Sequence, residues 1–382
     1  MQLRHWASGA VLAGALGALA VRTCAAQDAS SQPFVTTSVR TFTDSDHVRV
    51  RSLITDWLGN LGKTSNMLSL HWNNEQVTIP AISAPPGSQA AVDAITTASR
   101  PISGNAYSDF VKTRNEVEAE VSNRSTAVNY YVSSEPDYLA QQIGGRYNRD
   151  MGNPLLNLSF GSSYGWDDIK PLPDDLNHTA ASSKTTLYVN SVATRILSPS
   201  TLLRAGGEYF IVNGLQHSPY RNVYAGGVYV PENHPDHRER RDLFLRLNQY
   251  LPNRSSIKLN YRLYNDDWGI LSHEIDSSLS QYITQGVWAR YEYRYYTQTP
   301  ADFYRHEYAT TNGINGYLTG DYRLGDLSSH LFGSSLHWGM DALAADHPVL
   351  SRTTLWLDYE RYFNSNNYSA NILEAGLDFH FQ

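Results

Sequence analysis

Charged side chains recur at every second position in several segments of this chain, and the clearest run is Arg290, Glu292 and Arg294. Residues two apart lie on the same face of a β-strand, so these three charges would share one face. Five further charged residues stand in segments with the same alternation: Lys258, Arg262, Asp358, Glu360 and Asp378. Inside a barrel, such a cluster sets ion selectivity if the lumen is open. The alternative is that the charges pair with one another and fill a closed interior.

Histidines and acids gather between residues 213 and 237, where a transition metal could bind. They are His217, Glu232, His234, Asp236 and His237. A dedicated metal site has regular ligand spacing on a rigid element, and this proline-containing segment has neither. We therefore interpret it as a solvated polar loop and expect neither a metal nor another cofactor.

A third group could do acid–base or nucleophilic chemistry at the rim of a barrel. It consists of Asp266, Asp267, Trp268 and His273, followed in a later segment by Asp302, Tyr304 and His306. We find no serine spaced with a histidine and a carboxamide, as an outer-membrane phospholipase would need. A structural role fits better, in which Asp266 and Asp267 cap a tight turn and Trp268 anchors at the membrane interface. We therefore expect no catalytic residues and no enzyme.

The elements that would position these residues are β-strands, because apolar and polar residues alternate over many segments of about ten residues. Leu259 and Tyr261, for example, alternate with Asn260 and Arg262. Strands of soluble domains average about 5–6 residues, whereas a tilted strand needs about 9–11 to cross a membrane. The length favours an all-β fold, a closed antiparallel transmembrane β-barrel of the outer-membrane type with its apolar face outside.

The composition excludes several other classes of protein. With 30 basic and 37 acidic residues the chain is not a basic nucleic-acid binder, and no nucleic-acid partner is expected. Beyond the N-terminus it has no apolar run of about 18 residues, which excludes a helical membrane bundle. The 26 tyrosines are expected at the two membrane interfaces, with sugar-stacking platforms as the alternative.

Residues 1–26 read as an export signal, with a positive start, an apolar stretch and small residues before the cleavage point. Cleavage would remove Cys24, the only cysteine, and leave neither a disulfide nor a thiol nucleophile. A lipid anchor at Cys24 is the weaker alternative, because Arg22 stands where a small or apolar residue is expected. We expect residues 27–382 to form a single barrel domain in the outer membrane.

The connections predict the number of strands, since outer-membrane barrels alternate short periplasmic turns with longer outer loops. Counting back from a periplasmic C-terminus gives short turns near 341–347, 284–286, 251–254, 197–200 and 148–153. The outer connections are then 365–368, 298–326, 265–271, 213–237 and 167–183. Earlier strands are expected at 34–42, 47–58, 65–72, 113–122, 125–133 and 138–148, which makes 16 strands in all. The first pair is the weakest, so 14 is the alternative, and residues 80–101 read as a loop or plug insertion with a short helix over 88–97.

The chain ends in a strand that carries Phe379 and Phe381 on one face. This pattern resembles the signal that outer-membrane barrels present to their assembly machinery. Gln382 departs from it, because the usual final residue is Phe. The assembly machinery and outer-membrane lipid are therefore the expected partners.

Several longer motifs resemble a bacterial family of predicted outer-membrane barrels of unknown function. The matching stretches are 133–138 (SSEPDY), 197–203 (LSPSTLL), 218–221 (SPYR), 231–232 (PE) with 235–238 (PDHR), 266–269 (DDWG) with 272–273 (SH), 295–298 (YYTQ) and 301–304 (ADFY). Thr97 departs from the family pattern, which tends to have Gly there. The resemblance implies the fold and the outer-membrane location but no activity. Genes for flavin-transfer and thioredoxin-like proteins often lie near those of the family, which implies an envelope redox context.

Three functions compete at this stage. The first is a passive channel or a structural component of the envelope. The second is an accessory barrel that holds a periplasmic redox or flavin-linked partner, and the third is a hydrolase active at the rim. Single-channel conductance separates the first from the other two.

Overall fold

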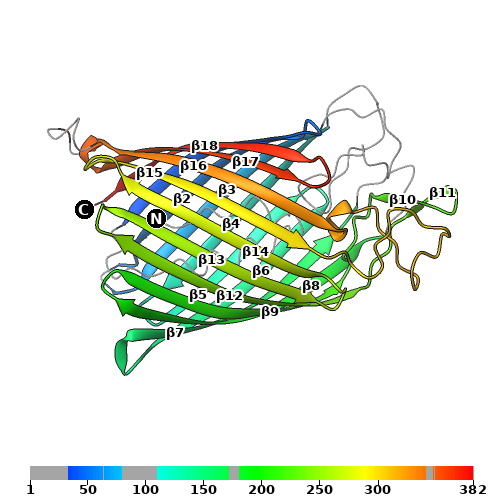
Figure 1. Ribbon diagram of the computed structural model, residues 1–382, viewed down its shortest axis with the longest axis horizontal. Helices are drawn as coiled ribbons and strands as arrows, with labels where there is room; N and C mark the ends of the chain where they lie inside the picture. Colours follow the sequence, from blue (N-terminus) through cyan, green and yellow to red (C-terminus); the bar gives the residue numbers. More distant parts are fainter. Residues whose placement is uncertain are drawn as a thin grey trace.

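The computed structural model describes residues 33–62, 64–79, 110–171, 180–340, 347 and 349–381. These residues form a closed barrel of 16 antiparallel strands (Figure 1). Strands that follow one another in the chain pair with one another, and the first strand closes the barrel by pairing with the last. A separate two-stranded sheet, β10–β11, lies outside this ring.

The structure sets the following bounds. The barrel strands are β1 (Phe34–Asp44), β2 (Arg49–Asn60), β3 (Met67–Ile79), β4 (Phe110–Ser122), β5 (Thr126–Glu135), β6 (Tyr138–Met151), β7 (Asn153–Ile169), β8 (Ser182–Ser198), β9 (Thr201–Gly214), β12 (His237–Leu251), β13 (Ser255–Asp266), β14 (Leu271–Tyr282), β15 (Val287–Gln298), β16 (Leu327–Gly339), β17 (Thr353–Asn364) and β18 (Ser369–His380). Outside the ring lie β10 (Asn222–Ala225), β11 (Val228–Pro231) and two 3-10 turns, η1 (Tyr322–Leu324) and η3 (Leu350–Arg352).

The prediction of 16 strands is confirmed, and the alternative of 14 is wrong. Several strands are longer than their apolar alternation indicated. The strand expected to end at residue 72 continues to Ile79, because its backbone pairing with β4 extends that far. The apolar pattern stops earlier, since polar side chains occupy the outer face beyond residue 72. Asn74 Nδ2, for example, donates to Asn115 Oδ1 across this ladder at 2.7 Å. The apolar alternation is limited to the membrane-spanning part of a strand, whereas backbone pairing continues beyond that part.

The connections alternate as expected. The start of β1 and the end of β18 lie at one end of the barrel, together with short turns, and the long connections lie at the other (Figure 1). We call these the periplasmic end and the outer end, following the pattern of short periplasmic turns. The export signal, the 80–101 insertion, its expected helix and Gln382 lie outside the described residues.

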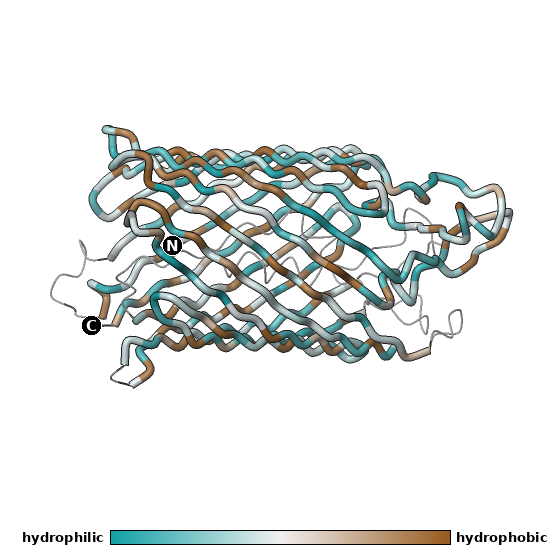
Figure 2. Tube along the Cα trace, turned by 90° about the horizontal axis from the view of Figure 1, so that it is seen from below, coloured by the Kyte–Doolittle hydropathy of each residue, from teal (hydrophilic) through white to brown (hydrophobic). Residues whose placement is uncertain are grey.

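The two faces of the wall differ in polarity, as the alternation predicted. Leu259 and Tyr291 are 47% and 58% exposed on the outside. Asn260 and Arg294, on the same strands, face the interior and are buried. Apolar and polar residues alternate along the strands around the barrel (Figure 2). An apolar exterior and a polar interior suit a barrel surrounded by lipid.

Apolar packing inside the barrel is concentrated toward its outer end. One cluster joins Trp268, Ile270, Ala301, Phe303 and Leu324, from the β13–β14 turn and the connection after β15. Another joins β10 to that same connection through Val223, Ala225, Tyr308 and Leu318. The outer connections are therefore folded onto one another.

In the part of the chain that the structure describes, no helix is long and apolar enough to cross a membrane.

Placing a charge on the outer face should cost far more than placing it on the inner face. Leu259→Arg is expected to weaken folding into lipid by about 2–4 kcal/mol, because the guanidinium would face hydrocarbon. The matched variant Asn260→Arg places the same side chain inside, between strands that carry Arg246 and Asp276 opposite it. Urea titration of the barrel in vesicles, read as a gel shift, measures both; equal destabilisation would mean that the faces are reversed.

Candidate functional site

The charged run on β15 forms ion pairs along the inner wall. Arg294 contacts Asp276 on β14 at 3.4 Å and Glu292 on its own strand at 3.3 Å. Arg290 reaches the other oxygen of Glu292, also at 3.3 Å. The alternation therefore placed Arg290, Glu292 and Arg294 on the correct face, and the structure adds that both arginines are paired.

On β13, Arg262 and Lys258 have different surroundings. Arg262 contacts Asp242 on β12 at 3.0 Å and Glu208 on β9 at 3.9 Å. Lys258 forms no ion pair with any residue that the structure describes. The inner wall therefore combines an arginine held in ion pairs with an ammonium group that lies beyond ion-pair distance of the described acids.

The acids on β17 and β18 extend the cluster around the barrel. Asp358 and Glu360 line a cavity of about 20 Å³ together with Arg290 and Glu292, which is room for about one water molecule. Asp378 accepts hydrogen bonds from Thr36 Oγ1 at 2.9 Å and from Trp356 Nε1 at 3.0 Å. Of the predicted cluster, Arg290, Glu292, Asp358 and Glu360 thus meet in one place, whereas Asp378 belongs to the β18–β1 closure.

The sequence reasoning missed a further charged stretch on β3 and β4. Arg114 contacts Glu75 at 2.6 Å and Glu116 at 3.3 Å. Asn129 donates to Glu118 at 2.9 Å, and Tyr131 donates to Glu116 at 2.7 Å. The signal was present, because charged residues occupy positions 112, 114, 116, 118 and 120 in strict alternation.

Most inward-facing charges lie in two sectors of the wall, and β5–β8 between these sectors add Glu135, Arg146, Asp167 and Lys184. Within the described strands, the acidic sector (β17, β18 and β1–β4) carries ten acids and three cations: Asp44, Asp56, Glu75, Glu116, Glu118, Glu120, Asp358, Glu360, Glu374 and Asp378 against Arg40, Lys112 and Arg114. The basic sector (β9 and β12–β15) carries eight cations and six acids: Arg204, Arg238, Arg240, Arg246, Lys258, Arg262, Arg290 and Arg294 against Glu208, Asp242, Asp266, Glu274, Asp276 and Glu292. β2 and β12 lie eight strands apart in this ring of 16, so the two sectors face each other across the lumen.

Several polar atoms on the basic sector have no hydrogen-bond partner among the described residues. They are Asp242 Oδ1, Asn248 Oδ1, Asn260 Oδ1 and Arg262 Nε. Buried polar groups are nearly always hydrogen-bonded to protein or to water. Atoms of the same kind occur on other parts of the inner wall, among them Asn73 Oδ1 on β3 and Asn190 Oδ1 on β8.

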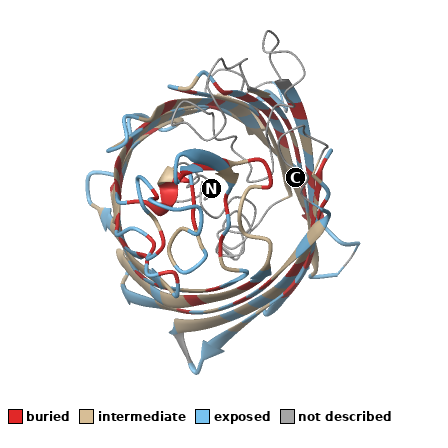
Figure 3. Ribbon diagram, turned by 90° about the vertical axis from the view of Figure 1, so that its right-hand side faces the viewer, coloured by how far each residue is buried: buried red, intermediate tan, exposed pale blue. Residues whose placement is uncertain are grey.

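At the outer end, two connections form a folded structure that we call the cap, residues 215–236 and 299–326. β-Bridges join Ala225 to Tyr308 and Asn233 to Leu318. Each bridge links a residue of the first connection to a residue of the second. In Figure 1, β10 and β11 lie beyond the barrel strands at the outer end. In the view along the barrel from this end, loops lie within the outline of the ring (Figure 3). The cap therefore overlies part of the mouth.

A buried carboxylate holds the cap together. Glu232 is 2% exposed, and its Oε1 accepts from Arg221 Nη1 at 3.0 Å and from the backbone N–H of Ser218 at 2.9 Å. Its Oε2 accepts from Thr319 Oγ1 at 3.2 Å, in the other half of the cap. Arg221 also contacts Asp321 at 3.3 Å. One ion network thus links both connections.

The same network perturbs the titration of its acids. Burial alone would raise the pKa of Glu232, but Arg221 and His234 lower it to about 2. Burial likewise opposes ionisation of Asp321, yet Arg323 and Arg221 hold its pKa below the usual value. Burial and the neighbouring His234 lower the pKa of His217. The cap therefore favours ionised acids and a neutral histidine.

The cap should consequently loosen as the pH falls. All three groups have pKa values depressed in the folded cap, so the unfolded cap binds more protons and stability is lost on acidification. The loss should begin below about pH 6.5 through His217 and continue below about pH 4.5 as Glu232 approaches its folded value of about 2. Limited proteolysis between pH 7 and pH 3 with an acid-tolerant protease measures it, and His217→Gln should remove the upper part of the change. Cleavage that does not vary with pH would contradict this.

The predicted roles of Asp266 and Trp268 had different outcomes. Asp266 does cap its turn, since its Oδ1 accepts from the N–H groups of Trp268 at 3.1 Å and Ile270 at 2.9 Å. The prediction that Trp268 anchors at the membrane interface is wrong, because its side chain is 4% exposed beneath the cap. Its Nε1 donates to the backbone oxygen of His237, and Arg238 lies 4.1 Å over its ring. Asp267 accepts from the Glu239 N–H at 2.9 Å.

The structure brings Asp302 to this turn and leaves His273 away from it. The Asp302 N–H donates to Trp268 O at 2.8 Å, and a Cβ at Gly269 would lie 2.3 Å from Asp302 Oδ1. Gly269 has φ +88°, which also favours glycine. Tyr304 packs with the same apolar cluster. His273 lies on the outer face of β14, where its Nδ1 contacts Tyr261 Oη at 2.8 Å, so it is not part of a common site.

The interpretation of residues 213–237 as a solvated loop is wrong for its central residues. His234 is buried beside Trp268 and Phe303. Glu232 is buried in the ion network described above. Burial here comes from contacts with a connection more than 60 residues away, which spacing along the chain does not reveal. Among the described residues, no group of three or more His, Cys, Asp or Glu side chains is placed to hold a metal ion.

The terminal aromatic residues lie where the barrel closes. Phe379 is opposite Val35 in the β18–β1 ladder, and its ring is 5.2 Å from that of Phe381. Phe379 is on the outward-facing side of β18, and Phe381 follows the end of that strand and is 37% exposed. Their role as an assembly signal stays a prediction.

The sequence matches the model of a known family. The model of a family described as "Protein of unknown function (DUF3570)" matches residues 8–346. No curated protein matches the chain.

Solved structures with a similar fold include three bacterial proteins. The siderophore receptor PirA from Pseudomonas aeruginosa is 12% identical with a TM-score of 0.41, over 88% of this chain and 56% of that one. A bacterial polysaccharide outer membrane secretin is 8% identical with a TM-score of 0.49, over 92% and 99%. The outer membrane protein opdK from Pseudomonas aeruginosa is 8% identical with a TM-score of 0.39, over 92% and 100%. This chain spans little more than half of the siderophore receptor.

Proposed function

The chain belongs to the DUF3570 family, proteins of unknown function, and we propose that it is a passive outer-membrane channel with a preference for cations. The observation that carries the proposal is the division of the inner wall into two opposed charge sectors. A wall with ten acids and three cations opposite a wall with eight cations and six acids creates a field across the lumen that acts on any passing ion. The acids outnumber the cations in total, which favours cations.

The competing proposal is a filled barrel whose charges serve only to neutralise one another. Paired arginines such as Arg294 fit that role. Lys258, which has no acid partner among the described residues, and the orphaned oxygens of Asn248 and Asn260 do not. An ammonium group without an ion pair and unsatisfied oxygens inside a dry barrel would cost several kcal/mol. These groups therefore support a hydrated lumen.

The outer-membrane location rests on the apolar outer face and the closed ring. A closed barrel has no free edge and unfolds only on heating, so the protein should fractionate with the outer membrane and migrate differently after boiling. A protein found in the soluble periplasm without detergent would contradict the location.

The rim residues do not favour an enzyme. Asp266 is engaged in its turn, and Asp302 lies against the backbone of that turn. A periplasmic redox partner stays a prediction from the family resemblance.

Single-channel recording of the refolded protein in a planar bilayer tests the channel. We expect discrete conductance steps and a reversal potential of cationic sign in a salt gradient. A fully folded, heat-modifiable barrel that gives no steps would contradict the channel and favour the filled barrel.

A further inference from the structure

Three arginines lie on the lipid-facing side of the wall at the outer end of the barrel. We call them the arginine patch: Arg49, Arg51 and Arg361. Arg49 and Arg51 begin β2, where they are exposed on either side of the buried Val50. Arg361, near the outer end of β17, shares the face of the exposed Tyr359. Because β1 and β18 lie between β2 and β17, the patch spans the seam where the first and last strands close the barrel.

The strand ladders place the patch at the outer edge of the membrane. The outermost row across these four strands is polar throughout: Arg49, Thr43, Asn371 and Arg361. The next row is mixed: Arg51, Thr41, Leu373 and Tyr359. In the row after that, Leu53 and Val39 are 39% and 54% exposed and begin the apolar band. A lipid-facing arginine costs far less at the interface than at the membrane centre, so the patch suits the level of the headgroups.

The patch is wider than a single phosphate. Neighbouring strands are about 4.8 Å apart, so the three strand spacings between Arg49 and Arg361 separate their Cα atoms by about 14 Å. Arg51 lies two residues from Arg49, which is about 7 Å along the strand. Three guanidinium groups over this area can hold more than one phosphate.

The patch has no acid on its own face. Among the described lipid-facing positions of β17, β18, β1 and β2, none carries Asp or Glu. Within the described residues, neither Arg49 nor Arg51 forms an ion pair. The exposed Arg241 at the outer end of β12 differs, because it is paired with Glu239 at 3.0 Å. The patch therefore presents three positive charges to the headgroup layer.

The two sides of the patch are joined through the β1–β2 and β17–β18 turns, which both lie at the outer end (Figure 1). The Ser45 N–H donates to Ser369 O at 2.7 Å, and the Ser369 N–H donates to Ser45 Oγ at 3.2 Å. Arg361 Nη2 donates to Ser369 Oγ at 3.1 Å. Asn371 Oδ1 accepts from Tyr359 Oη at 2.8 Å, which leaves the amide nitrogen of Asn371 as a further donor.

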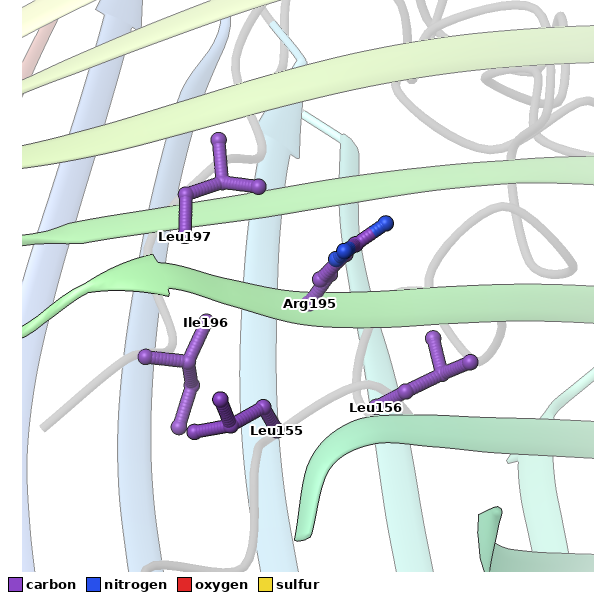
Figure 4. Close-up of a pocket in the computed structure, with 5 residues that line it drawn as sticks. All are labelled: Leu155, Leu156, Arg195, Ile196 and Leu197. Carbon is purple, nitrogen blue, oxygen red and sulfur yellow. The ribbon is translucent and has the colours of Figure 1, made fainter. Parts of the chain in front are cut away.

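Arg195 shows how a single lipid-facing arginine differs from the patch. It lines a cavity of about 280 Å³ at the periplasmic ends of β7 and β8, where the other lining residues are aliphatic: Leu155, Leu156, Ile196 and Leu197 (Figure 4). Its ladder partners are Leu156 and Leu203. Arg195 therefore has no polar neighbour in its ladders to share an anion, and it serves as a control.

We propose that the arginine patch binds the phosphate groups of lipid A, the glycolipid anchor of the outer leaflet of bacterial outer membranes. Guanidinium groups bind phosphate through paired hydrogen bonds. Lipid A carries two phosphates on one sugar headgroup, which suits three arginines in two rows better than the single phosphate of a phospholipid. Its acyl chains lie along the apolar band below the patch. The proposal rests on the outer-membrane location given above but does not depend on conduction.

The test uses the full barrel, refolded in detergent and mixed with equal amounts of lipid A and phosphatidylglycerol. Native mass spectrometry identifies the lipids that stay bound. We expect the wild type to retain lipid A in preference to phosphatidylglycerol, and to retain monophosphoryl lipid A, which lacks one phosphate, less well than lipid A. Equal retention of lipid A and phosphatidylglycerol would overturn the proposal, because any anionic headgroup would then suffice.

Variants measure what the patch contributes. An arginine near an anionic headgroup contributes about fivefold in affinity, so Arg49→Gln or Arg361→Gln should weaken lipid A binding about fivefold. The triple variant with Arg51→Gln should weaken it about 100-fold, with heat-modifiable migration unchanged. Arg195→Gln, and Arg241→Gln on β12, eight strands from β2, should leave binding unchanged. Wild-type affinity in the folded triple variant, or a fivefold loss in either control, would overturn the proposal.

Failure of this site and failure of the channel are distinguishable. A barrel that conducts ions without preferring lipid A overturns the lipid site alone. One that retains lipid A through the patch without conducting overturns the channel alone.

Discussion

Removal of residues 378–382 should abolish assembly of the barrel. The deletion takes away the ladder partners of Phe34, Val35 and Thr36, so the first strand is left with unpaired backbone groups where the ring must close. In lipid each such group costs several kcal/mol, because no water satisfies it. The deletion also removes Phe379 and Phe381. We expect no heat-modifiable band and no protein in the outer membrane.

The matched control is removal of Gln382 alone, which leaves the β18–β1 ladder intact up to His380 and places an aromatic residue last. This variant should assemble as well as the wild type or better. Normal assembly of the longer truncation would show that the terminal strand does not close the barrel.

Glu232→Gln should release the cap while leaving the barrel folded. It removes the charge that Arg221 faces in a buried site and weakens the link to Thr319. Breaking a buried ion pair by removing one partner typically costs about 3–5 kcal/mol. External protease should therefore cut within residues 215–236 or 299–326 far faster than in the wild type, with heat-modifiable migration unchanged.

Glu307→Gln serves as the control, because Glu307 lies exposed in the same cap. It should change neither cleavage nor migration. Wild-type resistance in Glu232→Gln would mean that the ion network does not hold the cap.

The barrel itself was predictable because its main constraint is local. Each strand alternates between lipid and interior, so the pattern around Leu259 and Asn260 carries its own orientation. The turns add the order of the strands, since neighbours in sequence are neighbours in the ring. Some strand ends, such as the one that contains Asn74, were not predicted, because backbone pairing continues there beyond the end of the apolar pattern.

The cap was not predictable, because its contacts join residues far apart in the chain. In the sequence, Glu232 is an acidic residue in a loop like many others. It is buried as the ion-pair partner of Arg221 because Thr319, in the other connection, packs against it. Trp268 was assigned to the membrane interface for the same reason, since nothing local shows that the cap covers it. The family motifs at 218–221, 231–238, 266–269 and 301–304 did mark the right segments.

Within the lumen, sequence placed charges on the correct face but could not pair them. Whether Arg294 meets Asp276 depends on the register between β14 and β15, and a shift of one residue would turn these side chains to opposite faces.

The ion pairs of Arg290 and Arg294 decide which variants can test permeation. Replacing Arg290 or Arg294 with Glu would place like charges beside Glu292 and unsettle the wall. Lys258 is the better probe of permeation.

The most direct test of a charged, conducting lumen is the reversal potential of Lys258→Glu in a salt gradient. The substitution changes the basic sector by two charge units without breaking an ion pair among the described residues. Lys170→Glu makes the same change in the exposed segment after β7 and is the control. The account predicts stronger cation selectivity in Lys258→Glu alone, and the shift should shrink as the Debye length falls from about 10 Å at 0.1 M to about 3 Å at 1 M salt. An unchanged reversal potential in a conducting Lys258→Glu barrel, or an equal shift in Lys170→Glu, would contradict it.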